Sequence, residues 1–390
     1  MSQANARIDV KKAALVMQFI GSIAFTLMNS FMPLFITIEL KETLIEATYW
    51  TGLFQTVGNF TTAVAAPFWG YMCDRVGTRK ILLITIVGNT VAYTGMALSN
   101  NVVSVILFRG LQGGFGGTST IMFALISSVV DASDLKTAIS YQLAAMTMSQ
   151  IVGPGLGGLF ASLVGYRLTF LVSALLYVSI TPIVLLLRPS LVSRDEEGGN
   201  RFGLTDFKMI LPDAFALILV YACINFVTPI VVYLLSSVGV AESQLLTYTV
   251  ITMTLNGLTY AAATPLVTRV VSDRTLPLLS VIGAGVIFAT AFATNPLQFI
   301  GLRLSIGAIQ AGIPPCLLGG KSGRKGLALG LLNSFRFIGQ AIGPFVATSI
   351  LGEGKPQQVL LVFLTMSGVS LFTAFFTYIT HTRHLSTKLL

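Results

Sequence analysis

Long apolar runs separated by short polar segments dominate the chain. A bilayer core about 30 Å thick is crossed by roughly 20 apolar residues in a helix. The runs are too long for barrel strands and do not alternate, and lipid offers no partner for backbone polar groups, so each run is predicted to be a helix. The twelve runs lie near residues 13–38, 48–72, 80–98, 102–124, 138–163, 167–188, 212–236, 245–268, 276–294, 297–319, 326–350 and 358–380.

Composition places the chain in the same class. Hydrophobic residues make up 54% of its 390 residues, charged residues only 10%, and the mean hydropathy is +0.82. Ordinary soluble domains carry about 25% charged residues. The composition therefore excludes a water-soluble globule and predicts an all-α integral membrane protein with twelve transmembrane helices, whose main surroundings are a lipid bilayer.

The net charge of +9 raises the question of a nucleic acid partner, and the distribution of the charges answers it. With a cytoplasmic N-terminus, 18 of the 24 Lys and Arg fall on the cytoplasmic side, and only Lys41, Arg167 and Lys355 fall outside. An excess of Lys and Arg on the cytoplasmic side is typical of membrane proteins and indicates how the chain is oriented in the membrane. We expect both termini in the cytoplasm, a location in the cytoplasmic (inner) membrane, and no nucleic acid partner.

Cysteine and histidine offer little to enzyme or metal chemistry. Cys73, Cys223 and Cys316 are scattered without C-x-x-C spacing, and His381 and His384 both follow the last predicted helix. Neither a metal site nor an intramembrane nucleophilic triad is indicated. We expect no cofactor, no metal ion and no enzymatic activity.

Internal repetition predicts the architecture. The segment Leu107–Gly117 is echoed by Leu302–Gly312, and the dipeptide Asp74-Arg75 is echoed by Asp273-Arg274. The echoes return after about half the chain, as expected for two six-helix halves related by an axis along the membrane normal. We predict an N-terminal bundle over residues 1–188, a polar cytoplasmic linker over 189–211, and a C-terminal bundle over 212–390.

A cluster of charged residues lies between the second and third apolar runs. Gly70, Asp74, Arg75, Gly77 and Arg79 are spaced as Gly, three residues, Asp-Arg, one residue, Gly, one residue, and then two basic residues. This pattern resembles the loop between helices 2 and 3 of the major facilitator superfamily.

That resemblance implies a gating role for the loop. Asp74 is expected to face the start of helix 11, and Arg75 or Arg79 is expected to pair with Asp131 at the cytoplasmic end of helix 4. A carboxylate beside a helix N-terminus is stabilised by the helix dipole, and such pairs are broken when that side opens. The loop is therefore expected to act as a latch that favours the outward-open state. The alternative is that the loop only determines topology.

A second motif lies in the fifth run. Glycine and proline bring helices close together and permit bends in lipid. The pattern Gly-Pro-x-x-Gly-Gly resembles the signature of the drug and proton antiporter branch of the superfamily, which implies export; close packing without a direction of transport is the alternative. The expected helix-bend residues are Gly153, Pro154, Gly157 and Gly158, with Gly343 and Pro344 as their echo in the second half.

Arg109, Arg303 and Arg336 lie well inside predicted helices. A charge at the bilayer centre costs about 2.5–3.5 kcal/mol on insertion scales, so such residues line water or bind a partner. Guanidinium suits bidentate binding of carboxylate or phosphate, so Arg336 and Arg303 suggest an acidic or zwitterionic solute. Arg109 also matches an arginine that the resemblance links to proton transfer. The alternative is that each arginine is satisfied by carbonyls and amides of the protein itself.

Polar residues spaced by three or four positions sketch the rest of a binding site. Such spacing places each set on one face of its helix. Either an aqueous cleft or hydrogen bonds between helices would satisfy these faces. The expected substrate-binding residues besides the three arginines are Asn29, Gln55, Asn59, Gln112, Tyr221, Asn225, Tyr233, Asn333 and Gln340.

Together these features predict a secondary transporter that works by alternating access. The resemblance implies proton-driven efflux of a small organic molecule, drug-like, amphipathic or carboxylate-bearing, by a monomer, with the residue that carries the proton left open. Uptake or exchange of an organic anion would use the same arginines. A transporter-like receptor or sensor is the alternative of another class.

Overall fold

The described part of the chain is helical throughout. The computed structural model describes residues 9–130, 132–187, 204–270, 275–314, 317 and 326–386. The first six predicted spans correspond to α1 (Val10–Thr26), η1 (Leu27–Ser30), α2 (Met32–Ile38), α3 (Leu44–Val76), α4 (Thr78–Leu98), α5 (Val102–Phe115), α6 (Thr118–Val129), α7 (Ala132–Val164) and α8 (Tyr166–Leu186). The remainder correspond to α9 (Leu204–Asn225), α10 (Val227–Ser237), η2 (Glu242–Gln244), α11 (Leu245–Val270), α12 (Leu276–Thr290), α13 (Pro296–Gln310), α15 (Gly326–Leu351) and α16 (Pro356–Ser386).

The all-α prediction is confirmed, but four spans expected to be continuous are divided. The first run bends through η1 just before Pro33, the fourth breaks at Gly116 and Gly117, the seventh breaks at Phe226, three residues before Pro229, and the tenth breaks at Ala311 and Gly312. Proline lacks the N–H that a helix interior needs, and glycine gains most freedom from leaving a helix. Spans one and seven therefore break at equivalent places in the two halves of the sequence.

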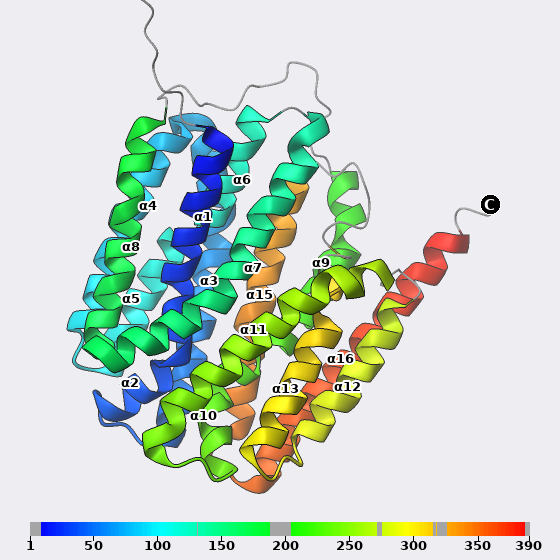
Figure 1. Ribbon diagram of the computed structural model, residues 1–390. Coiled ribbons are helices and arrows are strands. Elements are labelled where there is room, and N and C mark those ends of the chain that lie inside the picture. Colours follow the sequence, from blue (N-terminus) through cyan, green and yellow to red (C-terminus); the bar gives the residue numbers. More distant parts are fainter. Residues whose placement is uncertain are drawn as a thin grey trace, which may run out of the picture.

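The helices form two groups, with α1 to α8 on one side and α9 to α16 on the other (Figure 1). One large hydrophobic core is built from residues of α1 to α8. Two further cores are built almost entirely from residues of α9 to α16. The exception is Leu34 of α2, which is buried in a core of the second group, so α2 lies at the junction between the groups.

The two ends of the molecule differ in charge. One end, here called the basic end, carries Lys11, Lys12, Arg75 and Lys80, where α1 begins and α3 ends. The opposite end carries both signs, among them Glu39, Arg167, Glu353 and Lys355, and is here called the mixed-charge end.

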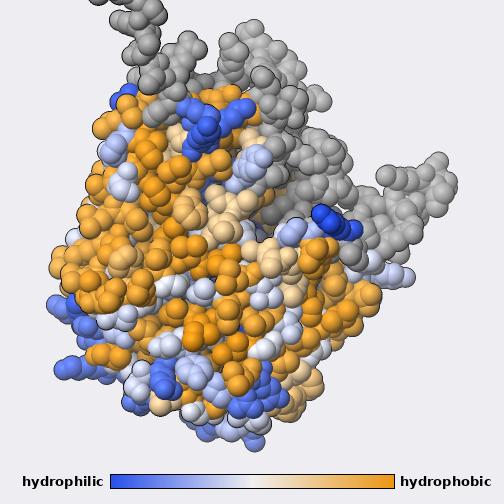
Figure 2. Space-filling view, viewed as in Figure 1, coloured by the Kyte–Doolittle hydropathy of each residue, from blue (hydrophilic) through white to orange (hydrophobic). Residues whose placement is uncertain are grey.

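Between the two ends, large apolar side chains cover the outer surface. Leu107, Leu163 and Leu297 are 68%, 69% and 79% exposed. Figure 2 shows this apolar covering over much of the viewed face. Seven described helical segments are, by length and composition, apolar enough to cross a membrane. Exposed apolar area on this scale is expected of a surface that meets lipid.

Close packing through glycine joins α7 to the first span. A Cβ on Gly157 would overlap the carbonyl oxygen of Leu27 and lie 2.7 Å from its carbonyl carbon. A Cβ on Gly153 would overlap the hydroxyl of Thr26. In the second half, a Cβ on Gly343 would lie 2.9 Å from the Cα of Ala222 in α9. These glycines let α7 and α15 pack directly against backbone.

We predict that Gly157→Ala destabilises the protein by about 1–3 kcal/mol, the usual range for overpacking. The obstructing atoms belong to the backbone of Leu27, which cannot rotate away. The measurement is thermal unfolding in detergent. Gly368→Ala in α16 is the matched control because nothing lies within 4 Å of the added Cβ. Equal unfolding midpoints for the two variants would contradict the packing argument.

Candidate functional site

Arg109 of α5 is fully buried within the first helix group. The centre of its guanidinium lies 4.5 Å from the ring centroid of Phe25 and 4.6 Å from that of Phe54. Its Nε edge lies against Gly58 of α3, where any Cβ would overlap it. Stacking between two aromatic rings stabilises the cation. The side chain thus lies between α1, α3 and α5.

The hydrogen bonds of Arg109 are incomplete. Its Nη1 donates to Gln112 Oε1 at 2.6 Å, and Gln112 Nε2 donates to Asn89 Oδ1 at 3.2 Å. Asn89 in turn donates to the carbonyl of Phe115, at the end of α5. The Nε and Nη2 atoms of Arg109 are buried without a hydrogen-bond partner. This chain of hydrogen bonds therefore leaves two guanidinium nitrogens of Arg109 without an acceptor.

Arg303 of α13 is its counterpart in the second group. Its Nη2 donates to the carbonyl of Ile224 at 2.9 Å, directly before the break between α9 and α10. The last carbonyls of a helix have no partner within it, and a basic side chain can satisfy them. Arg109 likewise lies at the break of the first span, with Nη1 3.8 Å from Met28 Sδ of η1. Both helix groups thus place an arginine beside a broken helix. Of the two, Arg303 donates a hydrogen bond to a backbone carbonyl at the break.

Arg336 of α15 is buried among aromatic side chains of the second helix group. Its guanidinium centre is 5.6 Å from the ring centroid of Tyr221 and 4.6 Å from that of Phe337, and its Nε is buried without a partner. Tyr260 of α11 lies within electrostatic range of both Arg336 and Tyr221. The exposed fraction of Arg336 is 4%. Arg336 therefore has aromatic neighbours from both α9 and α11.

Several predicted polar residues bridge the two helix groups. Asn59 of α3 donates to the carbonyl of Gln340 at 3.3 Å, and Asn333 donates to Ser119 Oγ of α6 at 3.3 Å. Thr56 adds a bond to the carbonyl of Ala341 at 3.0 Å. In this structure the polar faces of α3 and α15 meet each other.

The remaining predicted residues are placed more locally. Gln55 donates to Asn29 Oδ1 at 2.8 Å, which joins α3 to η1. Asn225 donates to the carbonyl of Tyr221 within α9. Tyr233 donates to the carbonyl of Gly354 in the turn between α15 and α16, so the structure places it at the mixed-charge end, apart from the arginines.

The gating loop is described in part. Gly77 has φ of 93°, a conformation that L side chains rarely adopt, and it joins α3 directly to α4. Arg75 lies over the ring of Tyr71 on its own helix, 4.8 Å from the centroid. A Cβ added to Gly70 would lie 3.5 Å from Thr120 Cγ2 of α6. Asp131 and the side chain of Asp74 lie outside the described residues, so the ion pairs expected for Arg75 and Arg79 stay a prediction.

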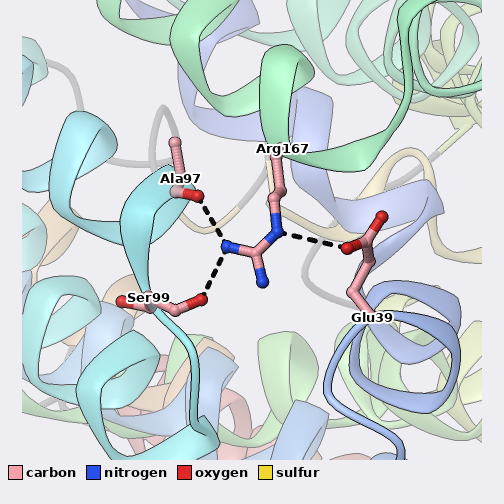
Figure 3. A network of polar contacts seen from close by, with 4 residues as sticks. All are labelled: Glu39, Ala97, Ser99 and Arg167. Atoms are coloured by element: carbon pink, nitrogen blue, oxygen red, sulfur yellow. Dashed lines mark hydrogen bonds and ion pairs between the residues drawn. The ribbon is translucent and has the colours of Figure 1, made fainter.

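An arginine that we did not expect in the site forms a clamp at the mixed-charge end. Arg167 donates to Glu39 Oε2 at 3.1 Å and to the carbonyls of Ala97 and Ser99 at 2.9 and 2.8 Å (Figure 3). It therefore ties the start of α8 to the end of α4 and to the end of α2. The pair with Glu39 is about one-third exposed, and such pairs add little stability. The two carbonyl bonds make Arg167 mainly a link between helix ends.

Three other residues of the polar interior were missed. Asn89 completes the Arg109 chain, Tyr260 approaches Arg336, and Gln142 of α7 is fully buried with both amide atoms unpartnered. Asn89 and Gln142 could have been found as single amides inside apolar runs. Tyr260 carries no such signal, because tyrosine is equally common against lipid headgroups.

The described side chains form no metal centre, and one small cavity lies in the second helix group. Among the described residues, no three His, Cys, Asp or Glu side chains gather in one place. A cavity of about 10 Å³, lined by Cys223, Ser280, Gln310 and Ser370 among others, lies between α9, α12, α13 and α16. Its volume suits about one water molecule, and none of the three buried arginines lines it.

Known proteins resemble this chain over nearly its whole length. Multidrug resistance protein MdtG of Klebsiella pneumoniae (strain 342) is 25% identical over 96% of this chain and 95% of that protein. The protein of the same name from Escherichia coli (strain K12 / DH10B) is 24% identical over 92% and 91%.

Solved structures share the fold. A D-xylose-proton symporter gives a TM-score of 0.77 at 13% identity, covering 95% of this chain and 96% of that one. The human organic anion transporter MFSD10 (TETRAN) gives 0.66 at 18%, covering 96% and 100%. The sequence model described as Major Facilitator Superfamily matches residues 14–318. The chain belongs to the Major Facilitator Superfamily.

Proposed function

We propose that this protein is a secondary transporter that exports a small amphipathic or carboxylate-bearing organic molecule by alternating access, in exchange for protons. The observation that carries the substrate class is the state of Arg109 and Arg336. Both are buried with unpartnered guanidinium nitrogens, and none of the ion pairs found among the described residues involves either. A buried cation without an anion is strongly disfavoured, so an acidic solute suits these positions.

Similarity to known proteins supports both export and proton coupling. The relatives in Klebsiella and Escherichia are named for multidrug resistance, and one structural neighbour is a proton symporter. The glycines and proline of α7 resemble the antiporter signature. Uptake or exchange of an organic anion is the second candidate, and the unpartnered guanidinium nitrogens favour it equally.

The finer features of the proposal concern topology and gating. We place the basic end in the cytoplasm, because positive charge gathers on that side of membrane proteins. The bundles then span residues 1–188 and 212–390, joined by the linker over 189–211, and each monomer carries one pathway between its two bundles. Asp74, Arg75, Arg79 and Asp131 form the cytoplasmic latch, and the protein lies in the inner membrane.

Proteoliposomes with an imposed pH gradient test the coupling. We expect a radiolabelled carboxylate-bearing amphipath to move against the direction of proton flow, with cationic and neutral amphipaths moved less. Movement in the same direction as protons would favour anion uptake. Exchange that ignores the gradient would remove the antiport proposal altogether.

The two arginines at the helix breaks should separate stability from transport. Arg303→Met leaves the carbonyl of Ile224 without its donor and is expected to destabilise the protein by about 1–3 kcal/mol. Arg109→Met removes a buried charge with unpartnered donors, so thermal stability should be unchanged or higher, while transport falls roughly tenfold or more. The measurements are thermal unfolding and initial transport rate, with the lysine variants as controls. A loss of stability in Arg109→Met as large as that in Arg303→Met would make Arg109 structural.

Arg336→Ala tests the substrate class. Removing a charged hydrogen-bond donor costs about 1.5–3 kcal/mol, so acidic solutes should bind roughly tenfold more weakly or worse, while neutral solutes change less than about twofold. The measurement is a thermal-shift titration with matched acidic and neutral amphipaths. Arg336→Lys, which keeps the charge but loses the planar fork, should retain part of the affinity. An equal loss for both solutes would assign Arg336 to structure.

A further inference from the structure

The two most extensive crossings between the helix groups each pair one helix from either group. The first is between α3 and α15, and the second is between α7 and α11. At both crossings the helices approach through a glycine on one side and a branched side chain on the other.

At the first crossing, Thr348 of α15 fills the space beside Gly52 of α3. A Cβ on Gly52 would lie 2.8 Å from the Cβ of Thr348 and would overlap its hydroxyl. Thr348 is 2% exposed, and its hydroxyl already donates to the carbonyl of Pro344 at 2.9 Å. The side chain of Thr348, here called the knob, therefore fills a space, here called the hole, that exists only because residue 52 is glycine.

At the second crossing the arrangement is reversed. Gly158 of α7 provides the hole, and Val250 of α11 provides the knob: a Cβ on Gly158 would overlap Val250 Cγ2 and lie 3.3 Å from its Cβ. Here α11 carries the large residue, whereas α3 carries the small one at the first crossing.

Internal symmetry relates the two crossings residue by residue. Pro67 inside α3 and Pro265 inside α11 are offset by 198 residues, and Gly52 and Val250 share that offset. Pro154 inside α7 and Pro344 inside α15 are offset by 190 residues, as are Gly158 and Thr348. Each position that is a hole in one half is thus a knob in the other.

The next contacts along both crossings are reversed too. Ile151 of α7 packs against Gly257 of α11, where a Cβ would lie 2.9 Å from Ile151 Cγ1. With the same offsets, Gly257 corresponds to Asn59 of α3, and Ile151 corresponds to Ala341 of α15. Asn59 bonds the carbonyl of Gln340, directly before Ala341. At the α7–α11 crossing the larger residue of the pair, Ile151, is on α7. At the α3–α15 crossing the larger residue, Asn59, is on α3, which corresponds to α11.

All four knob and hole residues lie within roughly two turns of helix ends at the mixed-charge end. Alternating access requires the groups to part at this end in one half of the cycle. We propose that Gly52–Thr348 and Gly158–Val250 form two reciprocal steric interlocks, and that the fit of each knob in its hole sets how strongly the closed state of the mixed-charge end is favoured.

This inference rests on alternating access but not on any substrate or coupling ion, so a conformational measurement tests it independently of transport. Val103 at the start of α5 and Leu297 at the start of α13 are 58% and 79% exposed at the mixed-charge end. Cysteines placed there for spin labels, in a chain with Cys73, Cys223 and Cys316 replaced by alanine, report the separation of the helix groups by pulsed electron resonance in lipid nanodiscs.

Filling a hole should open this end. Gly52→Thr is expected to lower the ratio of closed to open populations about tenfold, equivalent to about 1.4 kcal/mol. The exchanged pair, Gly52→Thr with Thr348→Gly, should restore the ratio to within about twofold, because knob and hole have only changed sides. Gly158→Val and its exchange with Val250→Gly should repeat this pattern at the second crossing.

Gly285→Val in α12 is the matched control, because nothing lies within 4 Å of its added Cβ, and it should leave the distances unchanged. Unaltered distances in Gly52→Thr and Gly158→Val would overturn the proposal. A shift that the exchanged pairs fail to reverse would also overturn it, since a general loss of helix packing would then explain the change. If distances shift as expected while no tested solute is transported, the interlocks stand and only the proposed function fails.

Discussion

A cation buried in an apolar interior without an acidic partner is the constraint from which the interior of this protein follows. Arg109 lies between Phe25 and Phe54, bonds Gln112, and still has two buried nitrogens without acceptors. Burial of an unpaired charge is among the most costly arrangements in a protein. The aromatic rings, the glycine at position 58 and the amide chain through Asn89 reduce this cost without removing it. An interior so arranged is better suited to receiving an anion than to maximal stability.

The two helix groups then show how arginines in similar settings can take different roles. Arg109 and Arg303 both lie at a broken first helix of their bundle, but Arg303 satisfies the carbonyl of Ile224 and Arg109 does not satisfy an equivalent carbonyl. One arginine with a backbone acceptor is enough to hold its own helix break in place. Arg109 has no such acceptor and keeps unpartnered donors.

The sequence predicted the helices more fully than the site. Apolar length alone identified the spans, because a bilayer permits few other structures. The breaks near Pro33, Gly116 and Pro229 were not predicted, although these residues carried the signal. Tyr233 had helical spacing with Asn225, yet it bonds the turn at Gly354, because spacing cannot tell how far along a helix a face remains buried. Arg167 was assigned only to topology, since its partners Ala97 and Ser99 contribute backbone carbonyls, which no side-chain pattern reveals.

The polar stripes of α3 and α15 follow from a demand that only a moving interface makes. If their meeting faces were wholly apolar, separating them would expose area at about 25 cal/mol per Å², and the closed state would become a trap. Asn59, Thr56 and Asn333 instead join the groups by hydrogen bonds, whose net contribution is about 0.5–1.5 kcal/mol each because water replaces them when the faces part. Hydrogen bonds of this kind fix how α3 and α15 align with each other. They do not lower the free energy of the closed state so far that the faces cannot part. Shape complementarity between glycine and branched side chains then supplies selectivity for one packed geometry, and it is lost within a small displacement. An interface that combines exchangeable hydrogen bonds with short-range steric fit can be both well defined and readily opened.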